Sequence, residues 1–522
     1  MPVRNFRGYY SAFGSALEEL YRDEHLTLAA GENEPEFEYD SEVFARAAEW
    51  IREQGKFTPS MLRQKPARAV INETLRVLSS AVSSSITQEV PEELVAALEN
   101  NAFIFSGFKT FHSLSEVGLS LTTDDGKVKP YAEFQRDVEK IDDTYNSNYL
   151  RAEYNQAVAS SQMAVKWQEF QHDGDRYNLQ YRTAADEKVR AEHAALQDIT
   201  LAVDDPFWDE FMPPNGWNCR CTVVQVRKSK YEASDSEHAI EVGREITSAP
   251  KQQMFRFNPG KQMKLFPDKH PYNKAPEPAK KVVTELAERH ATPIKTRQDL
   301  EDEMKNIAGE TDWFARGFNQ MLVTTKKGVN GSTDMNGVIF LTGSKMKACI
   351  SGIDKMRRGD KPDRKEADAL STLWHEINHN RNKQGNKVMS RDQTLLMEMA
   401  NEYVSRQTLP EFYEQFGCEV SHREFMTNRD STGYNRMVCT YQKLIELTQS
   451  DNAKVVQDVQ KHLFEGEYTD QLTGLVDAIS NNQSFTKSNG KKLTKQEVTR
   501  LVKECQRTTE DGIKRTFDVL TR

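Results

Sequence analysis

Apolar positions recur with a helical spacing along most of this chain. Between residues 130 and 170 they fall every three or four residues, which predicts amphipathic helices packed into a bundle. The positions that set this spacing are Phe134, Val138, Ile141, Tyr145 and Tyr149. Residues 1–125 and 440–522 have a similar spacing of apolar positions, so we expect both regions to be mainly helical.

The pattern changes after residue 170. Short apolar runs, Pro-Pro-Asn-Gly and a β-rich "CTVVQV" predict a small α+β module that ends near residue 250. Proline and glycine are then dense, which predicts an extended tail and linker, and Thr296-x-x-Asp299 can cap the first helix of another folded unit. We therefore expect an α+β multidomain protein. Its four parts are residues 1–125, 126–250, 251–295 and 296–522.

Composition narrows the class of protein. Of the 522 residues, 37% are hydrophobic and 29% are charged, which predicts a globular chain of about three domains. The net charge of −9 disfavours a nucleic-acid coat but leaves local, non-specific DNA contact open. Apolar runs fall short of the ~18 residues of a membrane span, and the N-terminus lacks the apolar core of a signal peptide. We expect synthesis in the cytoplasm and no membrane span.

Six cysteines are too few for a disulfide framework in a chain of this length. Four of them are scattered, and we expect them to be reduced thiols in the core. They are Cys349, Cys418, Cys439 and Cys505. The other two, Cys219 and Cys221, lie together in "NCRC" and are a separate case.

The segment Ser371–Lys383, "STLWHEINHNRNK", contains His-Glu-x-x-His and lies on a predicted helix. Asp363-x-x-Glu366, after a proline, is typical of a helix start with a capping box. Four apolar residues mark the buried face of this helix. They are Leu370, Leu373, Trp374 and Ile377.

The two histidines of this segment suit zinc. His375 and His379 are four residues apart, so both imidazoles lie on one face and can reach one ion at ~2 Å. Glu376, beside them, can take a proton from a water activated by the metal. The residue types and spacing predict a zinc-dependent peptidase, with Glu376 as the catalytic residue and His375 and His379 as metal ligands.

A third ligand is expected from the next helix. Ser390-x-x-Gln393 is another capping-box pattern, and Glu398 and Glu402 lie four residues apart on one face of the helix that follows. Both follow His379 at a distance that allows one loop and two to three helical turns. Either carboxylate can therefore be the ligand.

"HEINH" followed by "NEYVS" resembles the gluzincin type of zinc peptidase. That resemblance implies a zincin-like fold for residues 296–522 and assigns the third ligand to Glu402, between Asn401 and Ser405. Arg406 stands where many such enzymes have an aspartate, and Glu398 remains the alternative ligand. An exposed ion pair between Glu402 and Arg406, four residues apart, is the structural alternative.

Two further elements of such a site are expected near the metal helix. A β-rich run at Val338–Leu341, after the turn-rich "KKGVNGSTD", predicts a strand. The gluzincin resemblance implies a sheet edge beside the metal helix, at which an extended substrate can add as a strand, and this strand is compatible with that layout. A donor for the oxyanion is also needed. His422, Tyr413 and Tyr434 are candidates that the sequence does not rank.

A second resemblance covers roughly residues 130–275. Arg182-Thr183, "VRAEH" with His193, and "PPNGWNCRC" ending at Cys221 resemble the phage head morphogenesis family named for protein F of phage Mu. The resemblance implies a minor head protein that associates with portal and capsid proteins. It implies no reaction.

Physically, "NCRC" brings two thiols close enough to share one metal ion. Cys219 and Cys221 can supply two thiolates, and His193 can supply a third ligand. The alternative is a pair of reduced cysteines at the start of a buried strand, because the spacing matches no common zinc module.

Together these features predict a phage minor head protein that carries a zinc-dependent peptidase in residues 296–522. We expect it in the host bacterial cytoplasm during assembly and afterwards in the virion, in the head interior or near the portal. Its partners would be portal and capsid proteins and a protein or peptide substrate. A structural capsid protein with a non-catalytic zinc site, and a toxin or effector delivered by the phage, are the alternatives.

Overall fold

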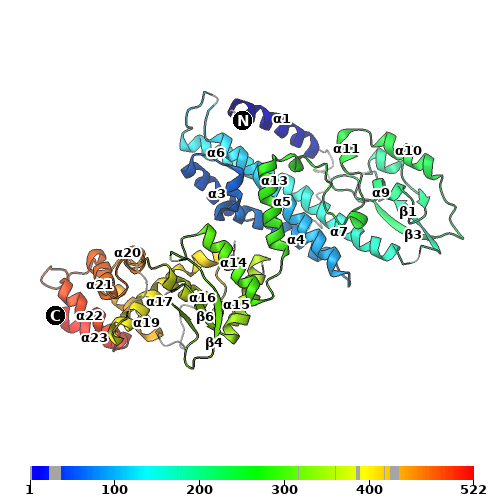
Figure 1. The fold of residues 1–522 in the computed structure, drawn as a ribbon. Helices are drawn as coiled ribbons and strands as arrows, with labels where there is room; N and C mark the ends of the chain where they lie inside the picture. The colour runs from blue at the N-terminus through cyan, green and yellow to red at the C-terminus, as the bar shows by residue number, and fades with distance from the viewer. Residues whose placement is uncertain are drawn as a thin grey trace. The chain divides into compact units, whose positions relative to one another are not determined.

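The computed structural model describes most of the chain, with short gaps. The residues described are 3–22, 37–123, 125–172, 174–187, 189–315, 317–334, 336–358, 360–383, 388–416, 418–423 and 434–521. The chain forms two compact units, Met1–Thr292 and Pro293–Arg522, and Figure 1 shows their elements. Across the described residues, no helix is both long enough and apolar enough to cross a membrane.

The first unit is mainly helical, as expected, and contains one small sheet. Its elements are α1 (Val3–Tyr21), α3 (Ser41–Gln54), η1 (Pro59–Arg63), α4 (Lys65–Ser85), α5 (Glu92–Ser120), α6 (Tyr131–Asp142), η2 (Asp143–Tyr149), α7 (Leu150–Phe170), β1 (Tyr177–Arg182), α8 (Ala191–Ala194), β2 (Thr200–Leu201), α9 (Phe207–Phe211), β3 (Thr222–Arg227), α10 (Ser236–Ile246), α11 (Pro250–Met254), α12 (Pro259–Gln262), η3 (Pro271–Lys274) and α13 (Glu277–Ala291).

Two cores stabilise this unit. The long helices α4, α5 and α7 pack together in Figure 1, and their apolar faces form the larger core. The smaller core lies under the sheet, in which β1 pairs antiparallel with β2 on one side and with β3 on the other. Residues 177–246 thus combine a three-stranded sheet with short helices, and α7 contributes to both cores.

The expectation of an extended tail and linker over residues 251–295 is wrong. This stretch contains α11, α12, η3 and α13, and it lies within the first unit up to residue 292. Pro259, Pro271 and Pro278 stand in the first turn of α12, η3 and α13, where a missing backbone N–H costs nothing. Its apolar side chains join the larger core. They include Phe255, Phe257, Leu265, Phe266 and Tyr272.

A buried ion pair lies inside the helical core of the first unit. Lys109 on α5 donates a hydrogen bond to Glu153 on α7, and both side chains are almost completely buried. Tyr21 and Tyr272 also donate hydrogen bonds to the Glu153 carboxylate, over 2.7 and 3.2 Å. Burial lowers the pKa of Lys109, although Glu153 opposes this shift.

Replacing Lys109 with methionine should therefore destabilise the first unit by about 3–5 kcal/mol, because it leaves the Glu153 charge buried without its cation. Hydrogen exchange read by mass spectrometry on peptides from α5 and α7 measures this effect. Lys127→Met is the control. Its ion pair with Asp125 is exposed, so protection equal to that of the wild type is expected. Equal protection of α5 in both variants would contradict the prediction.

The second unit combines a small sheet with helices. Its elements are α14 (Arg297–Glu310), β4 (Met321–Thr324), β5 (Gly331–Thr333), β6 (Ile339–Thr342), α15 (Gly343–Arg357), α16 (Arg364–Asn380), α17 (Arg391–Glu414), α19 (Asn435–Leu447), α20 (Asn452–Glu465), α21 (Gln471–Asn482), α22 (Lys495–Cys505) and α23 (Glu510–Thr521). In the sheet, β6 is central: it pairs parallel with β4 and antiparallel with β5.

The strand at the expected sheet edge is not the predicted one. The run Val338–Leu341 falls largely in β6, which has a neighbour on both sides. The edge strand that contacts α16 is β5, Gly331–Thr333, which comes from the segment predicted to be a turn. Glycine and serine have low β propensity, so pairing with β6 and contact with α16 determine this strand, and local sequence does not.

Two cores also make up the second unit. One packs the sheet with α14, α15 and α16, and the other packs α19 to α23 around the N-terminal half of α17. Helix α17 belongs to both, through Met399 and Tyr403 at one end and Leu409 and Phe412 at the other. This helix therefore joins the sheet-containing lobe to the helical lobe.

Candidate functional site

The two helices that hold the candidate residues begin where the sequence predicts. Asp363 and Glu366 form a capping box at the start of α16, and Ser390 and Gln393 form one at the start of α17. The predicted apolar face of α16 is fully buried in the core around the sheet. Its residues are Leu370, Leu373, Trp374 and Ile377. Burial of that face fixes the rotation of α16 and turns the histidine face toward α17.

Three possible ligand atoms converge between α16 and α17. His375 Nε2 lies 3.0 Å from His379 Nε2 and 3.2 Å from Glu398 Oε2. The distance from His379 Nε2 to the same carboxylate oxygen is 3.5 Å. These three residues form one of the two groups of His, Cys, Asp or Glu within the described chain that could hold a metal ion.

Glu402 has a different position. Its Oε2 lies 2.8 Å from Nδ1 of His375, on the side of the ring away from the other ligand atoms. Its Oε1 accepts a hydrogen bond of 2.7 Å from Arg406 Nε. Nδ1 of His379 is also engaged, by the Tyr468 hydroxyl at 2.5 Å. Both rings thus have their Nδ1 atoms occupied and their Nε2 atoms directed toward Glu398.

Glu376 lies beside this group and is held from β5. The hydroxyl of Thr333 donates a hydrogen bond to Glu376 Oε2 over 2.9 Å. It also lies 3.0 Å from the main-chain carbonyl oxygen of Glu376. A Cβ on Gly331 would lie 2.8 Å from Glu376 Oε1 and 3.0 Å from its Cγ. Any side chain larger than that of glycine at position 331 would clash with the Glu376 carboxylate. Gly331 and Thr333 together therefore determine the position of Glu376.

Burial and the surrounding charges shift the acidities of these groups. Burial raises the pKa of Glu376 more than the neighbouring His379 and His375 lower it. For Glu398 burial also raises the pKa, but the charge and hydrogen bonds of the two histidines outweigh it and the net shift is downward. A carboxylate with a raised pKa is a stronger base, which suits Glu376 to accepting a proton.

The group opens into a cleft of about 550 Å³. Residues 328–333, α16 and α17 border it, and His375, Glu376, His379 and Glu398 all line it. Tyr434 lines it too, with its ring parallel to that of His375 at 6.3 Å between centroids. Tyr413, by contrast, is buried in the core around the sheet, and His422 is not among the residues that line the cleft.

Three residues of this site were not predicted. Thr333 and Gly331 lie in a segment whose composition indicates a turn, and Tyr468 lies 89 positions after His379. Nothing in the sequence Gly-Ser-Thr of strand β5 indicates that it contacts a glutamate on α16. Tyr468 has no spacing relation to the helix that it contacts.

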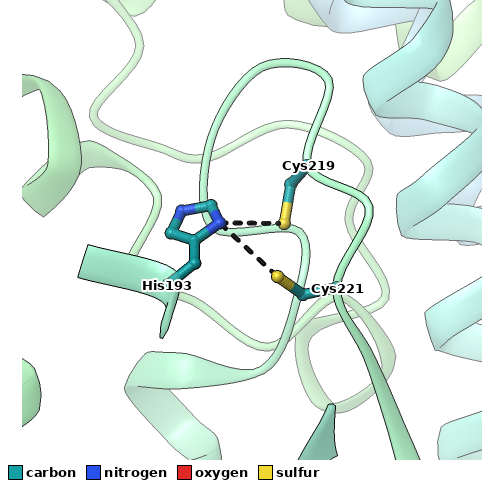
Figure 2. Close-up of side chains that lie close together, drawn as sticks. All are labelled: His193, Cys219 and Cys221. Atoms are coloured by element: carbon teal, nitrogen blue, oxygen red, sulfur yellow. Dashed lines mark hydrogen bonds between the residues drawn. The ribbon is translucent and has the colours of Figure 1, made fainter. Parts of the chain in front are cut away.

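The second group lies in the first unit. His193 on α8 faces Cys219 and Cys221, which stand just before β3, and Figure 2 shows the three side chains pointing toward one another. Nδ1 of His193 lies 3.6 Å from Cys219 Sγ and 3.5 Å from Cys221 Sγ. The hydrogen bond with Cys221 lowers the pKa of the Cys219 thiol, against burial, and His193 lowers it further. None of the six cysteines, all of them within the described residues, forms a disulfide bond.

Residues 128–224 match the family model described as "Phage Mu protein F like protein". Two curated relatives share this region. "Putative capsid assembly protein F" of Escherichia phage Mu is 38% identical over 71 residues, which are 13% of this chain and 16% of the relative. The "Mu-like prophage FluMu F protein" of Haemophilus influenzae is 40% identical over 68 residues, 12% of this chain and 16% of the relative.

The aligned part therefore spans about a sixth of the length of these relatives. No solved structure is significantly similar to the chain. The matched region contains His193, Cys219 and Cys221 but ends before the second unit, so the group on α16 and α17 rests on its own geometry.

Proposed function

We propose that this chain, whose residues 128–224 form a Phage Mu protein F-like domain, is a phage capsid-assembly protein that carries a zinc-dependent peptidase in residues 293–522. The capsid role rests on the matched family and on the relative described as a capsid assembly protein. Portal and capsid proteins would be its partners, and the virion its final location. One observation carries the peptidase role: His375, His379 and Glu398 converge in an open cleft beside Glu376.

The donor set fits zinc. Nitrogen and oxygen ligands about 2.0–2.2 Å from a tetrahedral ion lie about 3.3–3.5 Å apart, close to the 3.0, 3.2 and 3.5 Å separations in this group. Histidine ligands of zinc usually donate their other ring N–H to a carboxylate or another acceptor. Glu402 on His375 and Tyr468 on His379 fill those roles.

We infer that Glu398, and not Glu402, is the third ligand. Glu402 is then the residue that orients His375, and Arg406 holds Glu402 in turn. The ion pair between Glu402 and Arg406, given above as an exposed alternative to metal ligation, forms in a buried position, and Glu402 contacts His375 at the same time. The proposed third ligand, Glu398, thus lies one helical turn before Glu402, the ligand that the gluzincin resemblance implies.

A bound zinc ion would supply Lewis acidity toward water and the substrate carbonyl. An extended peptide can pair with the outer edge of β5, which has no strand partner on that side among the described residues. Glu376, placed by Thr333, accepts the proton of the attacking water and returns it to the leaving amine. Tyr434 is the candidate donor to the oxyanion because it alone of the three predicted candidates lines the cleft.

A peptide library tests this proposal without knowledge of the natural substrate. The purified full chain is incubated with peptides from a digested bacterial proteome, and new termini are identified by mass spectrometry. We expect cleavage that stops with a chelator and returns with added zinc. A zinc-loaded protein that creates no new termini would leave a non-catalytic metal site as the better explanation.

Gly331→Ala should reduce that cleavage by roughly 10- to 100-fold, because the added Cβ displaces the Glu376 carboxylate by a fraction of an ångström or more. Zinc content should stay unchanged, because the atoms nearest to the added Cβ on β5 all belong to Glu376 and none to the metal ligands on α16 and α17. Gly309→Ala, on α14 with open space around its Cβ position, is the matched control. Equal rates for the two alanine variants would show that the position of Glu376 does not limit the reaction.

A further inference from the structure

We propose that His193, Cys219 and Cys221 bind a zinc ion that is structurally independent of the peptidase site. The three side chains come from separate parts of the first unit, α8 and the segment that runs into β3. A metal held by them would tie α8 to the end of the "PPNGWNCRC" segment. The site would thereby fix the conformation of the Mu F-like domain.

The separations are those that a shared zinc ion requires. With Zn–S near 2.3 Å and Zn–N near 2.0–2.1 Å, tetrahedral geometry puts sulfur and nitrogen about 3.5–3.6 Å apart. The observed separations from His193 Nδ1 are 3.6 Å to Cys219 Sγ and 3.5 Å to Cys221 Sγ. All three atoms lie within 4.8 Å of one another.

Hydrogen bonds to His193 Nδ1 do not by themselves explain why both thiols are directed at that one atom. A neutral imidazole nitrogen has one lone pair and accepts one good hydrogen bond. Here two thiols point at the same nitrogen, and Figure 2 shows both sulfur atoms on one side of the ring. A cation between His193 Nδ1 and the two sulfur atoms would accept a lone pair from each of the three atoms at once.

The segment that carries the cysteines is held in place by neighbouring side chains. Arg190 donates to the carbonyl oxygen of Trp217 over 2.7 Å, and Tyr181 donates to Asn215 Oδ1 over 2.9 Å. Arg220, between the two cysteines, forms two hydrogen bonds of 2.6 Å with Asp186. The thiols are therefore presented on an ordered backbone, as a metal site needs.

Burial differs across the group. Cys219 and His193 are buried, whereas Cys221 is only partly so. Across the part of the chain that the structure describes, no fourth histidine, cysteine or carboxylate joins these three. The fourth position of a tetrahedral ion would thus be taken by water or by a group from another protein.

Cobalt distinguishes this site from the one on α16 and α17. Thiolate ligands give Co²⁺ an intense near-ultraviolet charge-transfer band, and the α16–α17 group contains no sulfur. The full chain is stripped of metal under reducing conditions and titrated with Co²⁺. We expect the saturated band to correspond to one thiolate-bound Co²⁺ ion per chain, in addition to any ion bound at α16 and α17, and to be lost in Cys219→Ser/Cys221→Ser. Cys439→Ser, a partly buried cysteine in the second unit, should keep it.

A second measurement needs no substitution. Alkylation of the wild-type chain, read peptide by peptide in a mass spectrometer, should be slow at Cys219 and Cys221 with zinc and fast after chelation. Cobalt binding without the band, a band that survives in the double serine variant, or alkylation rates that ignore the metal would each overturn the proposal. Loss of peptidase activity would not, because that site has its own ligands.

Discussion

Glu376→Gln should reduce peptide cleavage by about 10²–10⁴-fold while zinc stays bound. Glutamine has nearly the volume of glutamate, and its amide oxygen can accept the hydrogen bond that Thr333 now donates to the carboxylate. The amide cannot accept a proton at neutral pH, so the general base is removed and the shape of the cleft is kept. Cleavage rate and zinc content, measured on the same preparation, separate these two effects.

The matched control is Glu446→Gln on α19. Glu446 is exposed and pairs with Lys443 on its own helix, away from the metal ligands. The Glu446→Gln variant should cleave peptides at the wild-type rate. If Glu376→Gln retains full activity with zinc bound, the proton is accepted elsewhere and the mechanism proposed for this cleft is wrong. If the variant loses zinc, the substitution has disturbed α16 and the test must be read from zinc-saturated protein.

Features determined by residues close in sequence could be predicted. The capping boxes at Thr296, Asp363 and Ser390 need only side chains three residues apart, and all three form. The placement of His375 and His379 on one face likewise follows from helical geometry alone. These parts of the fold and site are visible in the sequence because the interactions that create them are local.

Features determined by tertiary contact could not be predicted. Gly331–Thr333 is a strand because β6 pairs with it, and residues 251–295 are folded because their aromatic side chains enter a core built by distant helices. The choice between Glu398 and Glu402 is of this kind as well. Both lie on the face of α17 that meets α16, and only the way the two helices cross decides which carboxylate reaches the Nε2 atoms.

That choice gives the second large effect. Glu398→Ala should abolish tight zinc binding at α16 and α17, because it removes one of three ligands. Glu402→Ala should weaken zinc binding by only about 10- to 100-fold, the usual consequence of losing a group that orients a ligand. Competition against a chromophoric chelator measures both affinities. The sulfur-containing group in the first unit is titrated separately through its cobalt band.

Glu414→Ala, exposed near the end of α17, is the control for the effect of alanine on this helix, and its zinc affinity should equal that of the wild type. The reverse pattern, with zinc lost from Glu402→Ala and kept in Glu398→Ala, would restore the assignment that "NEYVS" suggests. It would require α17 to shift when the metal binds, because Glu402 now reaches Nδ1 of His375. The two substitutions thus test whether the arrangement of α16 and α17 described above is the metal-binding one.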